Sequence, residues 1–159
     1  MAFKLILALA IKNGLKTTDV FNQYVDIATL GTIADVVPLL GENRVIVDKG
    51  LKILHNPKRI GIRAIMEVAG VLDKPLNAST IAFSIAPRLN AAGRLGSAAT
   101  AVELLLTNDE SRARELALLL DTENKERQQT ERQIFDEALE LRRLNTVMIR
   151  MIGLDHCLS

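Results

Sequence analysis

Apolar residues recur at helical spacing along most of the chain. They fall three or four positions apart within 44–55 and 61–70, and the period of two that marks half-buried strands is almost absent. Short groups with Gly, Asn or Pro, such as Asn13-Gly14 and Pro38, indicate where helices end. The pattern predicts a mainly α-helical fold with few strands. The predicted helices are 2–11, 44–55, 61–70, 80–86 (with Asn77 in its N-cap region) and 97–106, and an apolar run covers 24–40.

The pattern from Asn108 onward predicts one long helix. Asn108 or Asp109 can cap its start, and it runs without Gly or Pro to about Leu144. Both ends are amphipathic, whereas 121–133 is polar on every face. Because the ends have apolar residues to bury and the middle has none, we interpret the helix as a connector between two lobes. One arm of a coiled coil is the alternative, but it needs an apolar repeat through the middle.

This interpretation divides the chain into three parts. Residues 1–107 form a helical lobe, 108–144 the connector helix, and 145–159 a tail too short to bury a core. The first helix is apolar on most sides and begins at Met1 without a capping residue. We therefore expect the chain to be an internal fragment of a longer protein.

Composition and charge exclude several kinds of protein. Twenty Lys and Arg against 19 Asp and Glu give a net charge of +1, so no global basic field attracts nucleic acid. Aromatic residues are only 3%, which argues against exposed base-stacking platforms. The single Cys157 and two distant histidines argue against disulfides and zinc. Lys4 and Lys12 interrupt the apolar first helix, so we expect neither signal peptide nor membrane span, and a cytoplasmic protein.

Asp35 is the first candidate for chemistry. It lies in an apolar sequence between Ala34 and Val36, where an ionised carboxylate is costly unless it is paired, hydrogen-bonded or bound to metal. The alternative is that Asp35 caps a turn before Pro38. Divalent metal sites use several oxygen ligands, and no other convergent carboxylate cluster is visible. Any further ligands would therefore lie outside this chain.

Residues 87–96 (PRLNAAGRLG) are the second candidate. Arg88 and Arg94 flank Asn90 in what we expect to be an irregular segment with small side chains, which would let a ligand approach the backbone. Arginine suits phosphate oxygens, and the start of the helix 97–106 can face the same anion. The alternative is a turn with two solvated arginines.

Arg127 and Gln128, on the polar stretch of the long helix, are weaker candidates. A solvated polar face is the favoured explanation for them. Asp155-His156-Cys157 resembles a metal or nucleophile motif, but it lies in the short tail and we assign it no role.

Several of these segments together resemble one enzyme family. Residues 31–44 (GTIADVVPLLGENR) are similar to the fourth motif of RecJ, the single-strand-specific 5′→3′ DNA exonucleases of the DHH phosphoesterase superfamily. Residues 87–96 and 124–128 (NKERQ) are similar to two further RecJ signatures, and 2–5 (AFKL) to the helix that follows the DHH motif. The resemblance covers about 2–140. Three matches in the same order point to RecJ rather than to the wider superfamily.

The resemblance implies a role for each candidate. Asp35 would bind the catalytic Mn²⁺ or Mg²⁺ of a two-metal site that hydrolyses phosphodiester bonds. Arg88, Asn90 and Arg94 would hold DNA phosphates, while Arg127 and Gln128 would face the cleft between two lobes. The resemblance further implies an α/β DHH domain of which this chain is a helical part, single-stranded DNA as substrate, and a helicase and a single-strand-binding protein as partners.

The chain also departs from the family. The upstream Asp-containing motifs, the Asp-His-His motif and the Gly- and His-rich motif of the second lobe are missing. We therefore expect a fragment of an exonuclease of DNA repair and recombination that is inactive alone. Two alternatives stay open: a small-nucleotide phosphoesterase of the same superfamily, and a non-catalytic helical scaffold.

Overall fold

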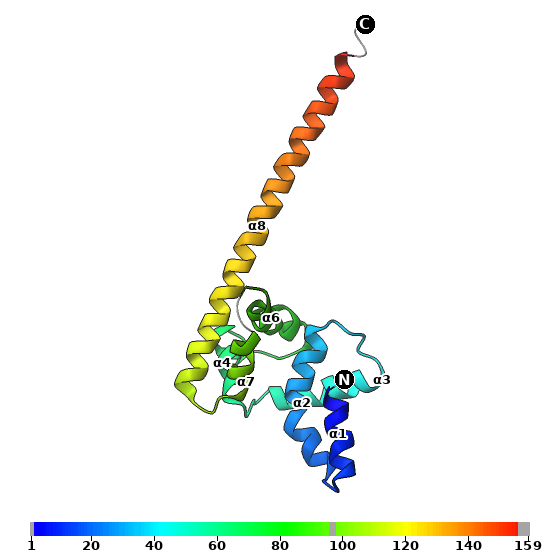
Figure 1. Ribbon diagram of the computed structural model, residues 1–159, viewed down its shortest axis with the longest axis vertical. Coiled ribbons are helices and arrows are strands. Elements are labelled where there is room, and N and C mark those ends of the chain that lie inside the picture. The colour runs from blue at the N-terminus through cyan, green and yellow to red at the C-terminus, as the bar shows by residue number, and fades with distance from the viewer. Residues whose placement is uncertain (1, 96–97, 156–159) are drawn as a thin grey trace. The chain divides into compact units, whose positions relative to one another are not determined.

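The computed structural model describes the backbone of residues 2–95 and 98–155 and the side chains of 2–91 and 98–143. The elements, in chain order, are α1 (Ala2–Lys12), α2 (Thr17–Ala34), α3 (Gly41–Leu54), α4 (Ile60–Val68), α5 (Ala78–Thr80), the π-helix η1 (Ile81–Ile85), α6 (Ala86–Leu95), α7 (Ala98–Leu106) and α8 (Glu110–Asp155) (Figure 1). These described ranges contain helices and no strand, which confirms the predicted helical class. The chain divides into two compact units, 1–124 and 125–159.

Several helix ends differ from the sequence prediction. The apolar run 24–40 belongs mostly to α2, which starts earlier, at Thr17, and ends at Ala34. Pro38 restricts the residue before it to extended backbone, so the chain leaves the helix ahead of it. Asp109 caps α8 as expected, because its Oδ1 accepts a hydrogen bond from the Arg112 N–H at 3.0 Å. The backbone of α8 continues to Asp155, beyond the predicted end near Leu144.

The segment 78–95 forms one continuous helical run. It begins where the Asn77 side chain accepts a hydrogen bond from the Thr80 N–H at 2.8 Å, the cap predicted from the sequence. A π-helix then covers Ile81–Ile85 and passes into α6. Pro87 explains the wider turn, because it has no N–H and its ring crowds the carbonyl group four residues earlier.

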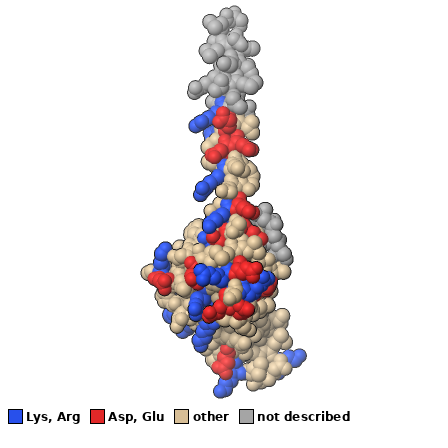
Figure 2. All heavy atoms as spheres, turned by 90° about the vertical axis from the view of Figure 1, so that its left-hand side faces the viewer, with Lys and Arg blue, Asp and Glu red and all other residues tan. Residues whose placement is uncertain are grey.

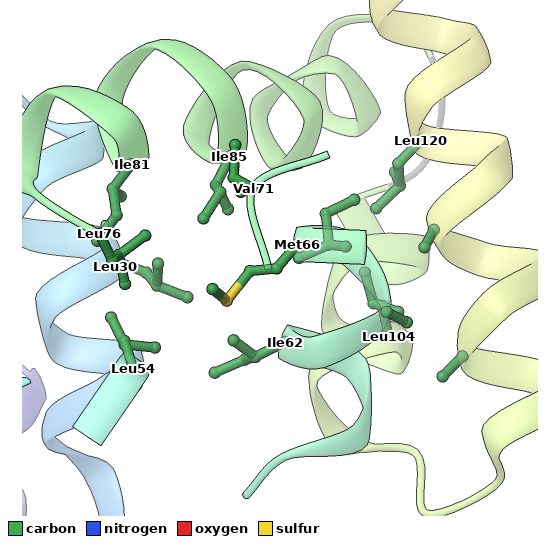
Figure 3. Packing of buried hydrophobic residues seen from close by; sticks show 14 of the residues in the cluster. Leu30, Leu54, Ile62, Met66, Val71, Leu76, Ile81, Ile85, Leu104 and Leu120 are labelled. Atoms are coloured by element: carbon green, nitrogen blue, oxygen red, sulfur yellow. The ribbon is translucent and has the colours of Figure 1, made fainter. Parts of the chain in front are cut away.

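The core of the first unit is assembled from most of its helices. Leu54, Ile62, Ile81 and Leu104 come from α3, α4, η1 and α7, and each has no exposed surface. Figure 3 shows Leu30, Met66 and Leu120 among the same buried cluster. Full burial of a large aliphatic side chain contributes roughly 1.5–3 kcal/mol, so this cluster is the main source of stability for the unit.

Two glycines let the helices of this unit approach closely. A Cβ added at Gly61 of α4 would lie 1.7 Å from the carbonyl oxygen of Leu104 in α7. A Cβ at Gly50 of α3 would lie 1.8 Å from Thr29 Oγ1 of α2, and that hydroxyl donates to the Ile46 carbonyl at 3.0 Å. No side chain larger than hydrogen fits either position.

An exposed ion pair joins α7 to α8. Arg112 contacts Glu103 at 2.7 Å and Glu115 at 2.9 Å. The hydrogen bond from Arg112 lowers the pKa of the Glu103 carboxyl, and the two carboxylates raise the pKa of Arg112. Similarly, the hydrogen bond from Lys52 lowers the pKa of Asp48 within α3. Each of these shifts favours the charged form, so Glu103, Asp48 and Arg112 are ionised at neutral pH.

The second unit consists, in its described part, of α8 alone. Side chains from 125 to 143 include polar residues on all sides and four exposed large apolar residues. These are Ile134, Phe135, Leu139 and Leu141. No helix in the described ranges is both long and apolar enough to cross a membrane. The connector role of α8 and the three-part division of the chain stay predictions.

Candidate metal and phosphate site

Asp35 occupies the C-terminal cap of α2. Its N–H donates to the Gly31 carbonyl at 3.1 Å, and its backbone angles are φ −85° and ψ 2°. The side chain is exposed, so the burial cost expected from its apolar sequence neighbours does not arise. Because α2 ends at Ala34, the Asp35 carboxylate does not lie on the apolar face that α2 buries. Asp35 thus sits at a helix end and is exposed, and its role as a metal ligand stays a prediction.

Val36 continues the turn in an unusual backbone conformation. Its φ of 52° lies in the left-handed region, which disfavours a β-branched side chain. Helices commonly place Gly at this position after the cap. Val36 is 85% exposed, so packing within this chain does not compensate for the strain. Strain of this kind is concentrated at functional sites, which makes the turn beside Asp35 a stronger candidate.

Asp35 lines a hollow of about 350 Å³ between α1, α2 and α3. Lys4 of α1, Thr32 of α2 and Asn43 at the start of α3 supply its other polar side chains. Lys4 forms an exposed ion pair with Glu42, and Asn43 donates to the Pro38 carbonyl at 3.1 Å. The hollow is therefore lined by one carboxylate, one hydroxyl, one cation and one amide.

Lys4 was not a sequence candidate for this site. In the sequence Lys4 only interrupts an apolar helix. No local pattern indicates that the start of this helix lies near Asp35. Among the described residues, no group of three or more His, Cys, Asp or Glu side chains comes together. The role of Asp35 as a metal ligand, and the place of any further ligands, stay predictions.

The second candidate, residues 87–96, is a correction to the sequence prediction. We expected an irregular segment, but residues 86–95 form α6. Ala, Leu and Arg are strong helix formers, and the continuous run from the Asn77 cap carries the helix past the single Gly93. Helix α2, which ends beside Asp35, packs against both η1 and α6. The structure thus brings the elements of the two candidate segments together.

The three predicted phosphate contacts differ in their surroundings. Asn90 is exposed on α6. Arg88 is mostly buried, and its Nε donates to Asp121 Oδ1 of α8 at 2.8 Å. The side chain of Arg94 lies outside the described residues, as do Gly96 and Ser97 before α7. The expected approach of the α7 N-terminus to the same anion therefore stays a prediction.

Arg127 and Gln128 lie on α8 in the second unit. Arg127 forms an ion pair with Glu131 one turn later, and Gln128 is exposed. Such pairs are typical of a solvated helix face. Their role in a DNA cleft stays a prediction.

The structure contains a buried carboxylate that the sequence reasoning missed. Asp26 is 6% exposed, and its Oδ2 accepts a hydrogen bond from Arg59 Nε at 2.9 Å. Arg59 also donates to the Gln23 carbonyl at 2.7 Å and lies 5.9 Å from the Tyr24 ring centre. The signal was present in the helical period, because position 26 lies one turn from the buried positions 29 and 30. Position 35 falls outside that stripe.

The surface charge agrees with the small net charge. On the face seen in Figure 2, basic and acidic side chains are intermixed, and neither sign forms a patch of its own. This face therefore offers an anion no basic patch, and attraction there depends on local contacts.

Comparison with solved structures shows that the chain has the fold of one segment of RecJ, an exonuclease solved with bound Mg²⁺ or manganese. The chain matches RecJ from Thermus thermophilus in complex with Mg²⁺, with a TM-score of 0.75 and 42% identity over 84% of this chain and 21% of that chain. It matches an exonuclease RecJ bound to manganese with a TM-score of 0.75 and 41% identity, over 84% of this chain and 33% of that chain.

The curated relatives that the chain matches are single-stranded-DNA-specific exonucleases. RecJ of Bacillus subtilis (strain 168) is 41% identical over 134 residues, and RecJ of Haemophilus influenzae is 43% identical over 148 residues. These alignments cover 84% and 89% of this chain but only 16% and 26% of the relatives. No protein-family model matches the chain. In sequence and in fold the chain corresponds to one segment of RecJ, a single-stranded-DNA-specific exonuclease, as its motifs predicted.

Proposed function

We propose that this chain is the part of a RecJ-type exonuclease that supplies one metal ligand, Asp35, and a phosphate-binding helix, α6. The observation that carries the proposal is the similarity to RecJ over most of the chain together with the exposed carboxylate of Asp35 at a strained turn beside a hollow. The two curated relatives are specific for single-stranded DNA, which favours a polymer substrate over a small nucleotide.

The residues present fit a divalent cation in part. Mg²⁺ and Mn²⁺ prefer oxygen ligands such as carboxylates. The Asp35 carboxylate is exposed, so a cation can reach it. A complete site needs several such ligands, which the described residues do not bring together. Bound metal ions would supply an activated water and neutralise the oxygens around the scissile phosphate.

Within this proposal the chain's own residues hold the DNA backbone. Asn90 faces solvent on α6 and can donate its amide N–H groups to a phosphate oxygen. Arg94, whose side chain lies outside the described residues, is a further phosphate contact that the resemblance implies. Contacts of this type position a strand without reading its bases.

Replacement of Asp35 tests the proposal. In the longer exonuclease that contains this segment, Asp35→Asn should lower metal-dependent cleavage of a labelled single strand by at least about 100-fold, because it removes a direct metal ligand. The melting temperature should not change, since Asp35 is exposed. Asp73→Asn, at an exposed position after α4, is the matched control and should cleave normally. Normal cleavage and normal Mn²⁺ binding in Asp35→Asn would overturn the proposal.

The resemblance also implies partners and a place in the cell. A helicase, a single-strand-binding protein and the cytoplasm are proposals at this level. They follow from the family alone, and no surface described above favours either protein over the other.

A further inference from the structure

We propose that Asn43 is a positioning residue for Asp35, because its side chain holds the strained turn on which the Asp35 carboxylate lies. The inference rests on the proposed role of Asp35 as a metal ligand and deepens it. Asn43 lies within the segment 31–44 that resembles the RecJ motif, but the resemblance gave this residue no role of its own.

The loop between α2 and α3 has little packing to fix its shape. Its residues 35, 36 and 38–40 are exposed, although the two helices that it joins pack against each other. A segment with few buried contacts changes conformation at a low cost in free energy. The hydrogen bonds of this loop therefore matter for how the turn beside Asp35 is held.

Hydrogen bonds restrain the loop at both ends. At the α2 end, the Val36 N–H donates to the Ile33 carbonyl at 3.1 Å. At the α3 end, Asn43 Nδ2 donates to the Pro38 carbonyl at 3.1 Å, and the Asn43 N–H donates to the Leu40 carbonyl at 3.1 Å. The Asn43 side chain thus joins the first turn of α3 to a residue only two positions after Val36.

The left-handed backbone of Val36 makes the bond between Asn43 and Pro38 important. With a φ of 52°, Val36 has a conformation that a β-branched residue leaves for the extended or right-handed region when nothing holds it. The cost of this conformation and the free energy of one neutral hydrogen bond are of the same order. Loss of the Asn43 side chain should therefore let Val36 relax and redirect the adjacent Asp35 carboxylate.

Asn43 and Asp35 also line the same hollow of about 350 Å³. Asn43 is half-buried there, whereas Asp35 is exposed. Glu42, the neighbour of Asn43, pairs with Lys4 of α1, so the start of α3 is tied to a second helix. Residues that orient a metal ligand from outside the coordination shell typically change metal affinity by about 10–100-fold. The bond from Asn43 to the loop fits such an indirect role.

Nuclear magnetic resonance on the 159-residue chain is the first test. In the parent, Val36 should show a strong nuclear Overhauser effect between its own N–H and Hα protons, which approach each other most closely at positive φ. Asn43→Ala should weaken this effect, because Val36 leaves the left-handed region. The melting temperature should fall by less than about 3 °C, since the lost hydrogen bond lies at the surface. An unchanged effect in Asn43→Ala would overturn the proposal.

Mn²⁺ binding by the longer exonuclease, measured by calorimetry, is the second test. Asn43→Ala should weaken Mn²⁺ binding by at least about tenfold. Glycine has a left-handed backbone without strain, so the turn in Val36→Gly does not depend on Asn43. Relative to Val36→Gly, the double variant Val36→Gly/Asn43→Ala should therefore lose less than about threefold, in a double-mutant cycle.

A direct contact of Asn43 with the ion gives a different result. In that case Asn43→Ala will cost the same factor with Val or Gly at position 36, and the proposal is wrong. It is also wrong if Asn43→Ala binds Mn²⁺ as tightly as the parent. Asn56→Ala, at an exposed position after α3, is the matched control and should bind Mn²⁺ normally.

The Asp35→Asn variant separates this inference from the proposed function. If Asp35→Asn binds Mn²⁺ as tightly as the parent, Asp35 is no metal ligand and Asn43 positions none, whatever the magnetic resonance data show of the turn. If Asp35→Asn loses Mn²⁺ and Asn43→Ala does not, the proposed function stands and the positioning role of Asn43 is wrong.

Discussion

Two aspartates near the ends of one apolar run show how little a residue's sequence neighbours say about its environment. Asp26 and Asp35 both interrupt that run, yet Asp26 is buried against Arg59 and Asp35 is exposed at the end of α2. The difference comes from helical phase, because position 26 lies on the face that α2 buries. A buried, paired carboxylate has a structural role, whereas the exposed one is available to a metal ion.

Val36, next to Asp35, should be replaceable by glycine with a gain in stability. Val36→Gly relieves the left-handed strain of a β-branched residue, worth roughly 1–3 kcal/mol, and costs about 0.5–1 kcal/mol in chain entropy. The free energy of unfolding of this chain should therefore rise by about 1 kcal/mol in urea denaturation. Val45→Gly, at a half-exposed position inside α3, is the control and should lower it by about 1 kcal/mol. Equal losses in both variants would show that Val36 is unstrained.

At the scale of elements, close helix packing sets the positions of the candidate residues. Gly61 lets α4 contact the backbone of α7, and Gly50 lets α3 contact Thr29 of α2. Helix α2 ends beside Asp35 and also packs against η1 and α6. The packing of α2 therefore sets the positions of both Asp35 and the segment 87–96.

Gly61→Ala should therefore destabilise the chain strongly. The added methyl group would overlap the Leu104 carbonyl, which belongs to the backbone and cannot rotate away, so α4 and α7 must separate. We expect the free energy of unfolding to fall by at least about 2 kcal/mol. Gly31→Ala is the matched control. A Cβ there meets nothing within 4 Å, so this change should raise stability by up to about 1 kcal/mol. A Gly61→Ala variant as stable as the parent would contradict the packing described for α4 and α7.

At the scale of the whole molecule, the first unit is a helical body with one core and, in its described residues, one candidate metal ligand. The chain spans between 16 and 26% of the length of the two curated relatives. Catalysis by two metal ions needs carboxylates from several segments, and the described residues contribute Asp35 without a cluster of further ligands.

The 159-residue chain by itself should therefore not cleave DNA. Incubation of a 5′-labelled single strand with the chain and Mn²⁺ should leave the strand intact, whereas a RecJ exonuclease under the same conditions degrades it. EDTA should leave the melting temperature of the chain within about 1 °C, because one exposed carboxylate binds a divalent ion too weakly to stabilise the fold. Mn²⁺-dependent cleavage that EDTA abolishes would show that the chain carries a complete site.

The sequence by itself determined the helical class, the Asn77 and Asp109 caps, the long helix from 110, and the RecJ motifs around Asp35 and Asn90. These features depend on spacing and on contacts between residues close in the chain, which can be read from the sequence. Only the tertiary structure decided that 86–95 is a helix, that Arg88 pairs with Asp121, and that Lys4 shares a hollow with Asp35. The helix 86–95 continues the run that begins at the Asn77 cap, so the single Gly93 does not end it. The other two features join residues far apart in the chain, and local pattern does not determine which distant surfaces pack together.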